Sequence, residues 1–352
     1  MSRLFSPITL RSLTVPNRVW VSPMCQYSAV DGLPNNWHLV HLGQLALGGA
    51  GLVMTEATAV VPEGRISPYD TGIWTDEQAE AWRRIASFVR EHGAVPAMQL
   101  AHAGRMASTA RPADGGGSLG DEAGGWQPVG PGPEPFNGYR EPRPLTAEEI
   151  SALPARFADA AERALGVGFQ AVELHFAHGY LVHQFLSPLS NHRTDAYGGD
   201  FSGRTRLALE IADAVRARVG EAVPVFARLS ATDWTPGGWA VEDSVGLAKL
   251  LSERGVDLVD ASSGGNVPHA DIPVGPGYQV ALAERIRRDA GVPTGAVGLI
   301  TDPAQAEQIV ASGAADTVLL GRVLLRDPRW PQRAAATLGA EARWPVQYLR
   351  AR

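Results

Sequence analysis

The chain contains 352 residues, of which 45% are hydrophobic and 19% are charged, and its formal net charge at pH 7 is −6. This mildly acidic balance includes no basic block, which argues against nucleic acid and an anionic membrane surface as partners. The first residues lack the apolar core of a signal peptide, and no run approaches the roughly 18 apolar residues of a membrane span. The single cysteine, Cys25, excludes internal disulfides and a thiolate-held iron–sulfur cluster, so we expect a soluble, cytoplasmic protein.

Eight short apolar runs, rich in β-branched residues, alternate with helical patterns along the chain. Continuous apolar runs are typical of strands that are buried on both faces of a parallel sheet. Eight such strands alternating with helices indicate one α/β domain over residues 1–352, a (β/α)8 TIM barrel. The expected strands are residues 18–24, 51–57, 94–102, 170–178, 223–231, 256–264, 292–298 and 316–322.

The clearest helical patterns cover residues 76–93, 153–168, 243–255 and 303–313. Several of them carry polar start signals and glycine stop signals, which we interpret as structural. These are the capping boxes Thr75 with Gln78 and Thr146 with Glu149, and the C-terminal glycines Gly93, Gly255 and Gly313.

Two segments depart from the alternation. Residues 6–17, SPITLRSLTVPN, resemble a hairpin that could close the bottom of the barrel. Residues 107–144 are crowded with glycine and proline and follow the third strand, which places them over the C-terminal mouth of the barrel. A structureless connection of this length is usually a functional lid or a disordered insertion, and we favour the lid.

Glycines end several of the last strands. In such barrels the loops after strands seven and eight often bind phosphate through backbone N–H groups. Gly264, Gly298 and Gly321 would let the backbone approach a ligand closely, and Arg322 would supply a forked cation. The alternative is that the glycines merely end strands and that Arg322 forms a salt bridge at the rim.

Three further residues stand near strand ends. Gln99 and Arg228 interrupt apolar strands, and a buried amide or charge needs a partner. Arg228 could pair with Glu173 one layer deeper, or it could hold an anionic ring system across the mouth. Cys25 is either a small buried hydrophobic residue or a ligand contact.

The fourth strand ends in HFAHGY, residues 175–180. If His175 faces inward and His178 and Tyr180 lie in the loop above, two neutral imidazoles could donate hydrogen bonds to one carbonyl oxygen, and the phenol could deliver a proton. A metal pair is the alternative interpretation, with His102 and Asp233 as possible further ligands. We expect no metal, because no other ligand cluster appears at suitable spacing.

With these residues in place, the chain resembles the Old Yellow Enzyme family of FMN-dependent ene-reductases, in particular its bacterial thermophilic-like class. The resemblance spans almost the whole chain, and HFAHGYLVHQFLSPLSNHRTDAYGG at 175–199 is its most specific part. The other segments that carry it are residues 22–29, 56–67, 99–105, 294–302 and 319–328. Met106 is a departure, since a lysine is frequent at that position in the family.

The resemblance implies a role for each matching residue. Tyr180 would be the proton donor, His175 and His178 would bind the substrate carbonyl, and Tyr27 would be a second substrate contact. Arg350, in a C-terminal segment 341–352 that contacts another subunit, would reach a neighbouring active site of a homodimer or homotetramer. The expected FMN contacts are Ser22, Pro23, Met24, Cys25, Ala57, Gln99 and Arg228 at the ring, and Ser263, Gly264, Gly298, Gly321 and Arg322 at the ribityl phosphate.

The implied activity follows from these roles. FMN, bound tightly but not covalently, would be reduced by NADPH or NADH and would then reduce the activated C=C bond of α,β-unsaturated carbonyl or nitro compounds. Hydride would reach Cβ, and Tyr180 would protonate Cα. A metal-dependent barrel hydrolase that uses His175 and His178, or a non-catalytic flavin-binding protein, are the alternatives.

Overall fold

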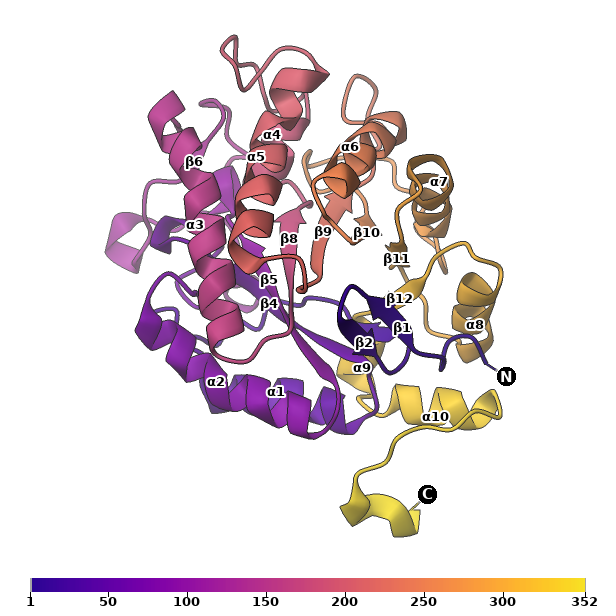
Figure 1. Cartoon of the computed structure of the whole chain (residues 1–352). Coiled ribbons are helices and arrows are strands. Elements are labelled where there is room, and N and C mark those ends of the chain that lie inside the picture. Colours follow the sequence, from indigo (N-terminus) through magenta and orange to yellow (C-terminus); the bar gives the residue numbers. More distant parts are fainter. Residues whose placement is uncertain (1, 352) are drawn as a thin grey trace.

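The structure is a computed structural model that describes residues 2–351, and its centre is a closed barrel of eight parallel strands surrounded by helices (Figure 1). The last strand pairs with the first, Val318 lying opposite Val19, so the sheet has no open edge. All eight predicted strands are present, and the (β/α)8 prediction is confirmed. The strands are β3 (Val19–Val21), β4 (Leu52–Ala59), β5 (Val95–Ala101), β8 (Ala171–Phe176), β9 (Val225–Ser230), β10 (Leu258–Ser262), β11 (Thr294–Ala296) and β12 (Thr317–Leu320).

The predicted helices are also present, and their polar caps have the expected contacts. Thr75 and Thr146 each accept a hydrogen bond from the third helical residue, which completes both capping boxes. The helix that was predicted at residues 153–168 begins at Ala147 instead of Leu153. The Thr146 cap fixes its start, and Pro154 is accommodated inside it. The helices are α1 (Asn36–Leu47), α2 (Asp76–Glu91), α3 (Ala147–Gly166), α4 (Leu181–Leu186), α5 (Phe201–Val219), α6 (Val241–Glu253), α7 (Val280–Ala290), α8 (Pro303–Ala311), α9 (Arg322–Arg326) and α10 (Trp330–Thr337). None of the helices among residues 2–351 combines the length and apolar character needed to span a bilayer.

The predicted hairpin closes the bottom of the barrel. Its strands, β1 (Ile8–Leu10) and β2 (Leu13–Val15), pair antiparallel, and Leu10 and Val15 belong to a buried cluster with residues of the barrel interior. In that cluster the rings of Trp20 and Phe226 have centroids 5.4 Å apart. The N-terminal ends of the strands are therefore sealed by apolar packing, which leaves the C-terminal mouth for polar chemistry.

The glycine-rich segment 107–144 has more local structure than predicted. It contains short 3-10 turns and a small parallel pair, β6 (Val129–Gly130) with β7 (Arg143–Pro144). The indole N–H of Trp126 donates to the carbonyl of Glu63 (3.0 Å), in the loop after β4. The segment thus lies beside the loops at the mouth of the barrel, and a lid function stays a prediction.

Replacing Trp20 with alanine should lower the free energy of unfolding by about 3–5 kcal/mol, because the substitution opens a cavity between the hairpin and the barrel. The ring is fully buried, and its indole N–H donates to the carbonyl of Asn17. Urea denaturation followed by circular dichroism measures the change. Val274→Ala, at a side chain that is 66% exposed, is the control and should change the free energy by less than about 0.5 kcal/mol. Equal effects of the two substitutions would contradict the role assigned to Trp20.

Candidate functional site

The end of β8 brings three rings together. The ring centroid of His175 lies 5.1 Å from that of His178 and 5.1 Å from that of Tyr180, and both pairs are edge to face. The chain turns sharply between them, with a left-handed backbone at His178 (φ 61°) and at Gly179 (φ 74°). A side chain at Gly179 would collide with the carbonyl of Gly265, so the turn requires glycine there.

Buried polar residues of α4 hold this turn in place. The backbone N–H of Gly179 donates to Nδ1 of His183 (2.9 Å), and Nε2 of His183 lies 3.0 Å from the carboxylate of Asp233. The amide of Gln184 donates to the carbonyl of Gly179 at 2.6 Å. The sequence analysis missed His183 and Gln184, although both lie inside the motif at 175–199, because nothing in the letters shows which side chains point back toward the turn.

The metal alternative for the histidine pair receives no support from these contacts. Asp233, one of the possible extra ligands, is engaged by His183 and Ser187. Among residues 2–351 no third ligand-type side chain groups with His175 and His178; the one such group is Cys25 with Glu56 and Asp70. The alternative of a metal-dependent hydrolase that uses this pair is therefore not favoured.

Both imidazoles of the pair are neutral at physiological pH. Burial, with Arg228 as the next cause, lowers the pKa of His175 and of His178 well below the ordinary value, even though His178 is only partly buried. Nδ1 of His175 accepts a hydrogen bond from the N–H of Ala177 (3.3 Å), so a neutral ring carries its proton on Nε2. Nε2 of His178 lies 2.7 Å from the hydroxyl of Ser262. The hydroxyl of Ser262, which the sequence analysis did not single out, also lies 3.5 Å from the side-chain oxygen of Gln279. When this hydroxyl donates to His178, the proton of the neutral imidazole is on Nδ1.

The phenol of Tyr180 stays protonated at the same site. It is the N-cap residue of α4, and burial raises its pKa well above the ordinary value, with Cys25 as the next cause. The site therefore combines two neutral donors with one neutral acid, a set that can grip an oxygen atom and supply a proton.

A layer of charged and polar side chains lies deeper in the barrel. Nε of Arg228 forms an ion pair with Asp260 (2.9 Å), and its NH2 group donates to Ser22 (3.2 Å). The amide of Gln99 donates to Glu173 at 2.8 Å. The ion pair of Arg228 with Glu173, one of the two possibilities from the sequence, is not observed. The ion pair is with Asp260, which the pairing of β9 with β10 places directly beside Arg228.

The first strand end supplies the predicted set from Ser22 to Cys25. Ser22 is buried, whereas Pro23, Met24 and Cys25 are partly open. Burial raises the pKa of the Cys25 thiol well above its ordinary value, with Asp70 as the next cause and Glu56 after it, so the side chain is a neutral thiol. Ala57 lies opposite Gln99 in the pairing of β4 with β5, and burial likewise raises the pKa of Tyr27.

A cavity of about 230 Å³ opens at the ends of β11 and β12. Gly298, Gly321 and Arg322, for which the sequence analysis proposed a phosphate contact, line this cavity. Arg326 and Gln279, which the sequence analysis did not name, line it as well. Ser263 does not line the cavity but donates to the side-chain oxygen of Gln279 (2.6 Å). Gly264 is also outside the lining, and its carbonyl accepts a hydrogen bond from Ser230. Two guanidinium groups beside a glycine-lined cavity are suited to a phosphate group.

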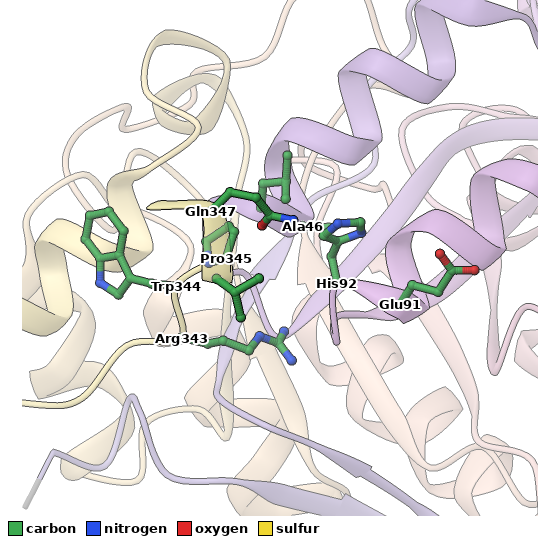
Figure 2. A pocket seen from close by; sticks show the side chains of 9 residues that line it. Ala46, Glu91, His92, Arg343, Trp344, Pro345 and Gln347 are labelled. Atoms are coloured by element: carbon green, nitrogen blue, oxygen red, sulfur yellow. The ribbon is translucent and has the colours of Figure 1, made fainter. Parts of the chain in front are cut away.

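Arg350 lies away from these residues of its own chain. It belongs to the terminal 3-10 segment Val346–Ala351, which Figure 1 shows standing apart from the barrel. Figure 2 shows the residues before it over a pocket of about 310 Å³, beside His92. The pocket is lined by the C-terminal ends of α1 and α2, which precede the N-terminal ends of β4 and β5. The C-terminal segment therefore starts at the end of the barrel that is opposite the mouth.

Comparisons with known proteins cover almost the whole chain. The model of the NADH:flavin oxidoreductase / NADH oxidase family matches residues 3–341. The NADPH dehydrogenase of Geobacillus thermodenitrificans (strain NG80-2) is 47% identical over 350 residues, which are 99% of this chain and 98% of the relative. Among solved structures, morphinone reductase has a TM-score of 0.80 at 31% identity, covering 98% of this chain and 91% of that chain. A complex of 2-naphthoyl-CoA reductase with 2-naphthoyl-CoA has a TM-score of 0.86 at 26% identity, and the match covers 96% of this chain but only 52% of that one.

The family match over residues 3–341 and the closed barrel both agree with the resemblance found in the sequence. The chain belongs to the NADH:flavin oxidoreductase / NADH oxidase family, that is, to the Old Yellow Enzymes.

Proposed function

We propose that this chain reduces activated alkenes at the end of β8, where His175 and His178 bind the activating oxygen of the substrate and Tyr180 supplies a proton. Membership of the family makes the chain an FMN-dependent ene-reductase that uses NAD(P)H. The observation that carries the assignment of roles is the edge-to-face cluster of two neutral imidazoles and one neutral phenol at the mouth. Its substrates are α,β-unsaturated aldehydes, ketones, maleimides or nitroalkenes.

The residues at the mouth fit FMN at both of its ends. Arg322 and Arg326 line a cavity large enough for a phosphate group, and Gly298 keeps the backbone close at a φ of 124° that favours glycine. At the other end, Arg228 and Gln99 present a cation and an amide at the level where the ring would lie. When bound, FMN supplies the hydride chemistry, taking hydride from NADPH and passing it to Cβ of the alkene.

The histidine pair stabilises charge that develops on the substrate oxygen. Neutral imidazole N–H groups held by a rigid turn act as preorganised donors, and such donors contribute most where negative charge increases in the transition state. The low pKa of each imidazole keeps it a donor without making it an acid that would compete with Tyr180. Tyr27 would provide the second contact to the substrate.

Tyr180 completes the reduction by giving its phenolic proton to Cα as hydride arrives at Cβ. Since burial raises the pKa of the phenol, the acid form is present over the whole physiological range. The phenolate that remains is reprotonated from water before the next turnover.

We infer that the enzyme is a homodimer or homotetramer in which Arg350 reaches the active site of a neighbouring subunit. Two observations support this: Arg350 stands apart from its own barrel, and the same segment exposes Val346 (75%) and Leu349 (52%), apolar side chains that are suited to a subunit contact. We further propose a cytoplasmic location, where NADPH is available, and NADPH as the preferred donor, as in the name of the Geobacillus relative.

Arg322→Gln should weaken FMN binding by about 10- to 100-fold, because a charge-assisted hydrogen bond to phosphate contributes roughly 1.5–3 kcal/mol. Quenching of flavin fluorescence on adding apoprotein measures the affinity. Riboflavin, which lacks the phosphate, is the control ligand and should bind the variant and the parent protein equally. Equal weakening of both flavins would show that Arg322 does not contact phosphate.

Tyr180→Phe should slow alkene reduction by about 10²–10⁴-fold, the usual contribution of a positioned general acid. Flavin reduction by NADPH should stay nearly unchanged, because hydride transfer to the ring needs no proton from Tyr180. Stopped-flow absorbance separates the two half-reactions. If flavin reduction falls by the same factor as alkene reduction, the assigned role is wrong.

Arg350→Ala should raise KM for the alkene while leaving flavin content unchanged, and the defect should be rescued between subunits. Mixing Arg350→Ala chains with Tyr180→Phe chains creates sites in which Tyr180 of one chain meets Arg350 of the other. We expect the mixture to recover activity above the sum of the two separate variants, as measured by NADPH oxidation with N-methylmaleimide. No recovery, with subunit exchange verified by mass spectrometry, would place Arg350 outside the neighbouring site.

A further inference from the structure

The layer beneath the histidine pair contains one carboxyl group more than it has cations. Glu173 on β8 and Asp260 on β10 are both 0% exposed, and Arg228 on β9 is 5% exposed. Arg228 pairs with Asp260, and Glu173 has the neutral amide of Gln99 as its hydrogen-bond donor. Two ionised carboxylates with one guanidinium would leave a net negative charge in the interior of the barrel.

Burying such a net charge is costly, whereas one added proton makes the layer neutral. Among residues 2–351, Oε2 of Glu173 and Oδ1 of Asp260 lack hydrogen-bond partners. Burial raises the pKa of Glu173 to about 8, with Asp260 as the next cause, while Arg228 and Gln99 act in the opposite direction. Burial also raises the pKa of Asp260. Glu173, which has a neutral amide as its hydrogen-bond donor, therefore exchanges a proton close to physiological pH, whereas Asp260 is paired directly with Arg228.

The other ionisable groups around Glu173 do not supply the missing cation. His175, on the same strand, and His183, on α4, are neutral or are already engaged: burial lowers the pKa of His175, and His183 contacts Asp233. The strand on the β5 side contributes the uncharged Gln99. Toward β3 and β4, Glu56 and Asp70 group around Cys25. Arg228 is therefore the cation that both carboxyl groups share.

We propose that Glu173 is the proton-accepting site that compensates the negative charge of the reduced flavin ring, so that reduction at mildly alkaline pH draws one proton from solvent into the Glu173–Asp260 pair. This inference rests on the proposed placement of the ring beside Arg228. A negative charge on the ring competes with the two carboxylates for the same guanidinium, so the affinity of Glu173 for a proton rises on reduction.

The proposed step balances in atoms and electrons. The C4–H bond of the nicotinamide breaks and an N–H bond of the ring forms, so hydride brings two electrons and one proton, NADP⁺ leaves, and the ring gains one negative charge. A separate proton from water forms an O–H bond on a carboxylate oxygen of Glu173. Hydride transfer itself consumes no proton from solution, so a proton that disappears has been taken up either by the reduced ring or by the protein. The comparison with Glu173→Gln separates these two acceptors.

Proton uptake on reduction tests the proposal directly. Weakly buffered holoenzyme is mixed with NADPH under anaerobic conditions, a pH indicator counts protons, and the flavin absorbance counts reduced sites. The native enzyme should take up roughly a half to one proton per flavin at pH 8.5 and close to none at pH 7, where Glu173 is already protonated. Glu173→Gln keeps a hydrogen-bond partner for Gln99 and should abolish the uptake at pH 8.5. Uptake that persists in this variant would overturn the proposal.

Two further variants serve as a control and as a substitute for Glu173→Gln. Asp70→Asn removes the other carboxyl group whose pKa is raised close to neutrality, to about 7, and should leave the uptake unchanged. Loss of uptake in Asp70→Asn with retention in Glu173→Gln would assign the proton to the group around Cys25 and overturn the proposal. If Glu173→Gln does not fold, Asp260→Asn leaves Glu173 as the one carboxylate of Arg228 and should move the uptake to lower pH; an unchanged pH range would contradict the shared layer.

The pH dependence of the midpoint potential of the bound flavin gives a second readout. Above pH 8 the equilibrium constant for reduction of the bound flavin should fall, per pH unit, by ten times more in the native enzyme than in Glu173→Gln. For a two-electron couple this factor corresponds to a midpoint potential that falls by about 30 mV more per pH unit. The same slope of midpoint potential against pH in the two proteins would refute the coupling between flavin reduction and protonation of Glu173. Purified protein without flavin would instead refute the proposed function, so the two failures are distinguishable.

Discussion

The chemistry at the mouth of this barrel depends on one buried cation. Arg228 is enclosed near the end of β9, where a guanidinium group is tolerated only because Asp260 lies beside it and Ser22 accepts a hydrogen bond. The same positive charge helps to lower the pKa of both histidines, so it keeps them neutral donors. It also determines how the proton shared by Glu173 and Asp260 is held. In the proposed mechanism, ring binding, the substrate clamp and charge compensation would all depend on this single side chain.

Closure of the barrel allows such a cation to be buried. Because the last strand pairs with the first, every backbone group of the ladder can be satisfied inside the sheet, and the strand ends converge on one mouth. The hairpin and Trp20 seal the opposite end with apolar packing. The polar residues thus lie between this apolar cluster and the loops at the mouth. In such surroundings of low polarity, the hydrogen bonds of a few oriented donors are stronger than in water.

The sequence was sufficient to predict the barrel, and most of the residues that it proposed for the site lie near the ends of the barrel strands in the structure. The eight apolar runs, the capping boxes and the glycines Gly93, Gly255 and Gly313 after three of the predicted helices depend on local chemistry, and the structure confirms them. Partners that are remote in sequence could not be predicted: the spacing within β8 suggests Glu173 as a partner for Arg228, whereas the register of β9 with β10 supplies Asp260. The contact between His178 and Ser262 joins residues 84 positions apart, and it depends on how the loop after β8 meets the end of β10. The roles of the individual site residues and of Arg350 come from the family resemblance, and they stay proposals because they need a bound ligand or a second subunit to be tested.

Anaerobic absorbance spectroscopy of the purified protein tests the central claim most directly. The account predicts that the protein carries the visible absorption of an oxidised flavin, that one equivalent of NADPH removes this absorption, and that cyclohexenone restores it with formation of the saturated ketone. A colourless protein would contradict the account. So would a flavin that NADPH reduces but that the enone does not reoxidise.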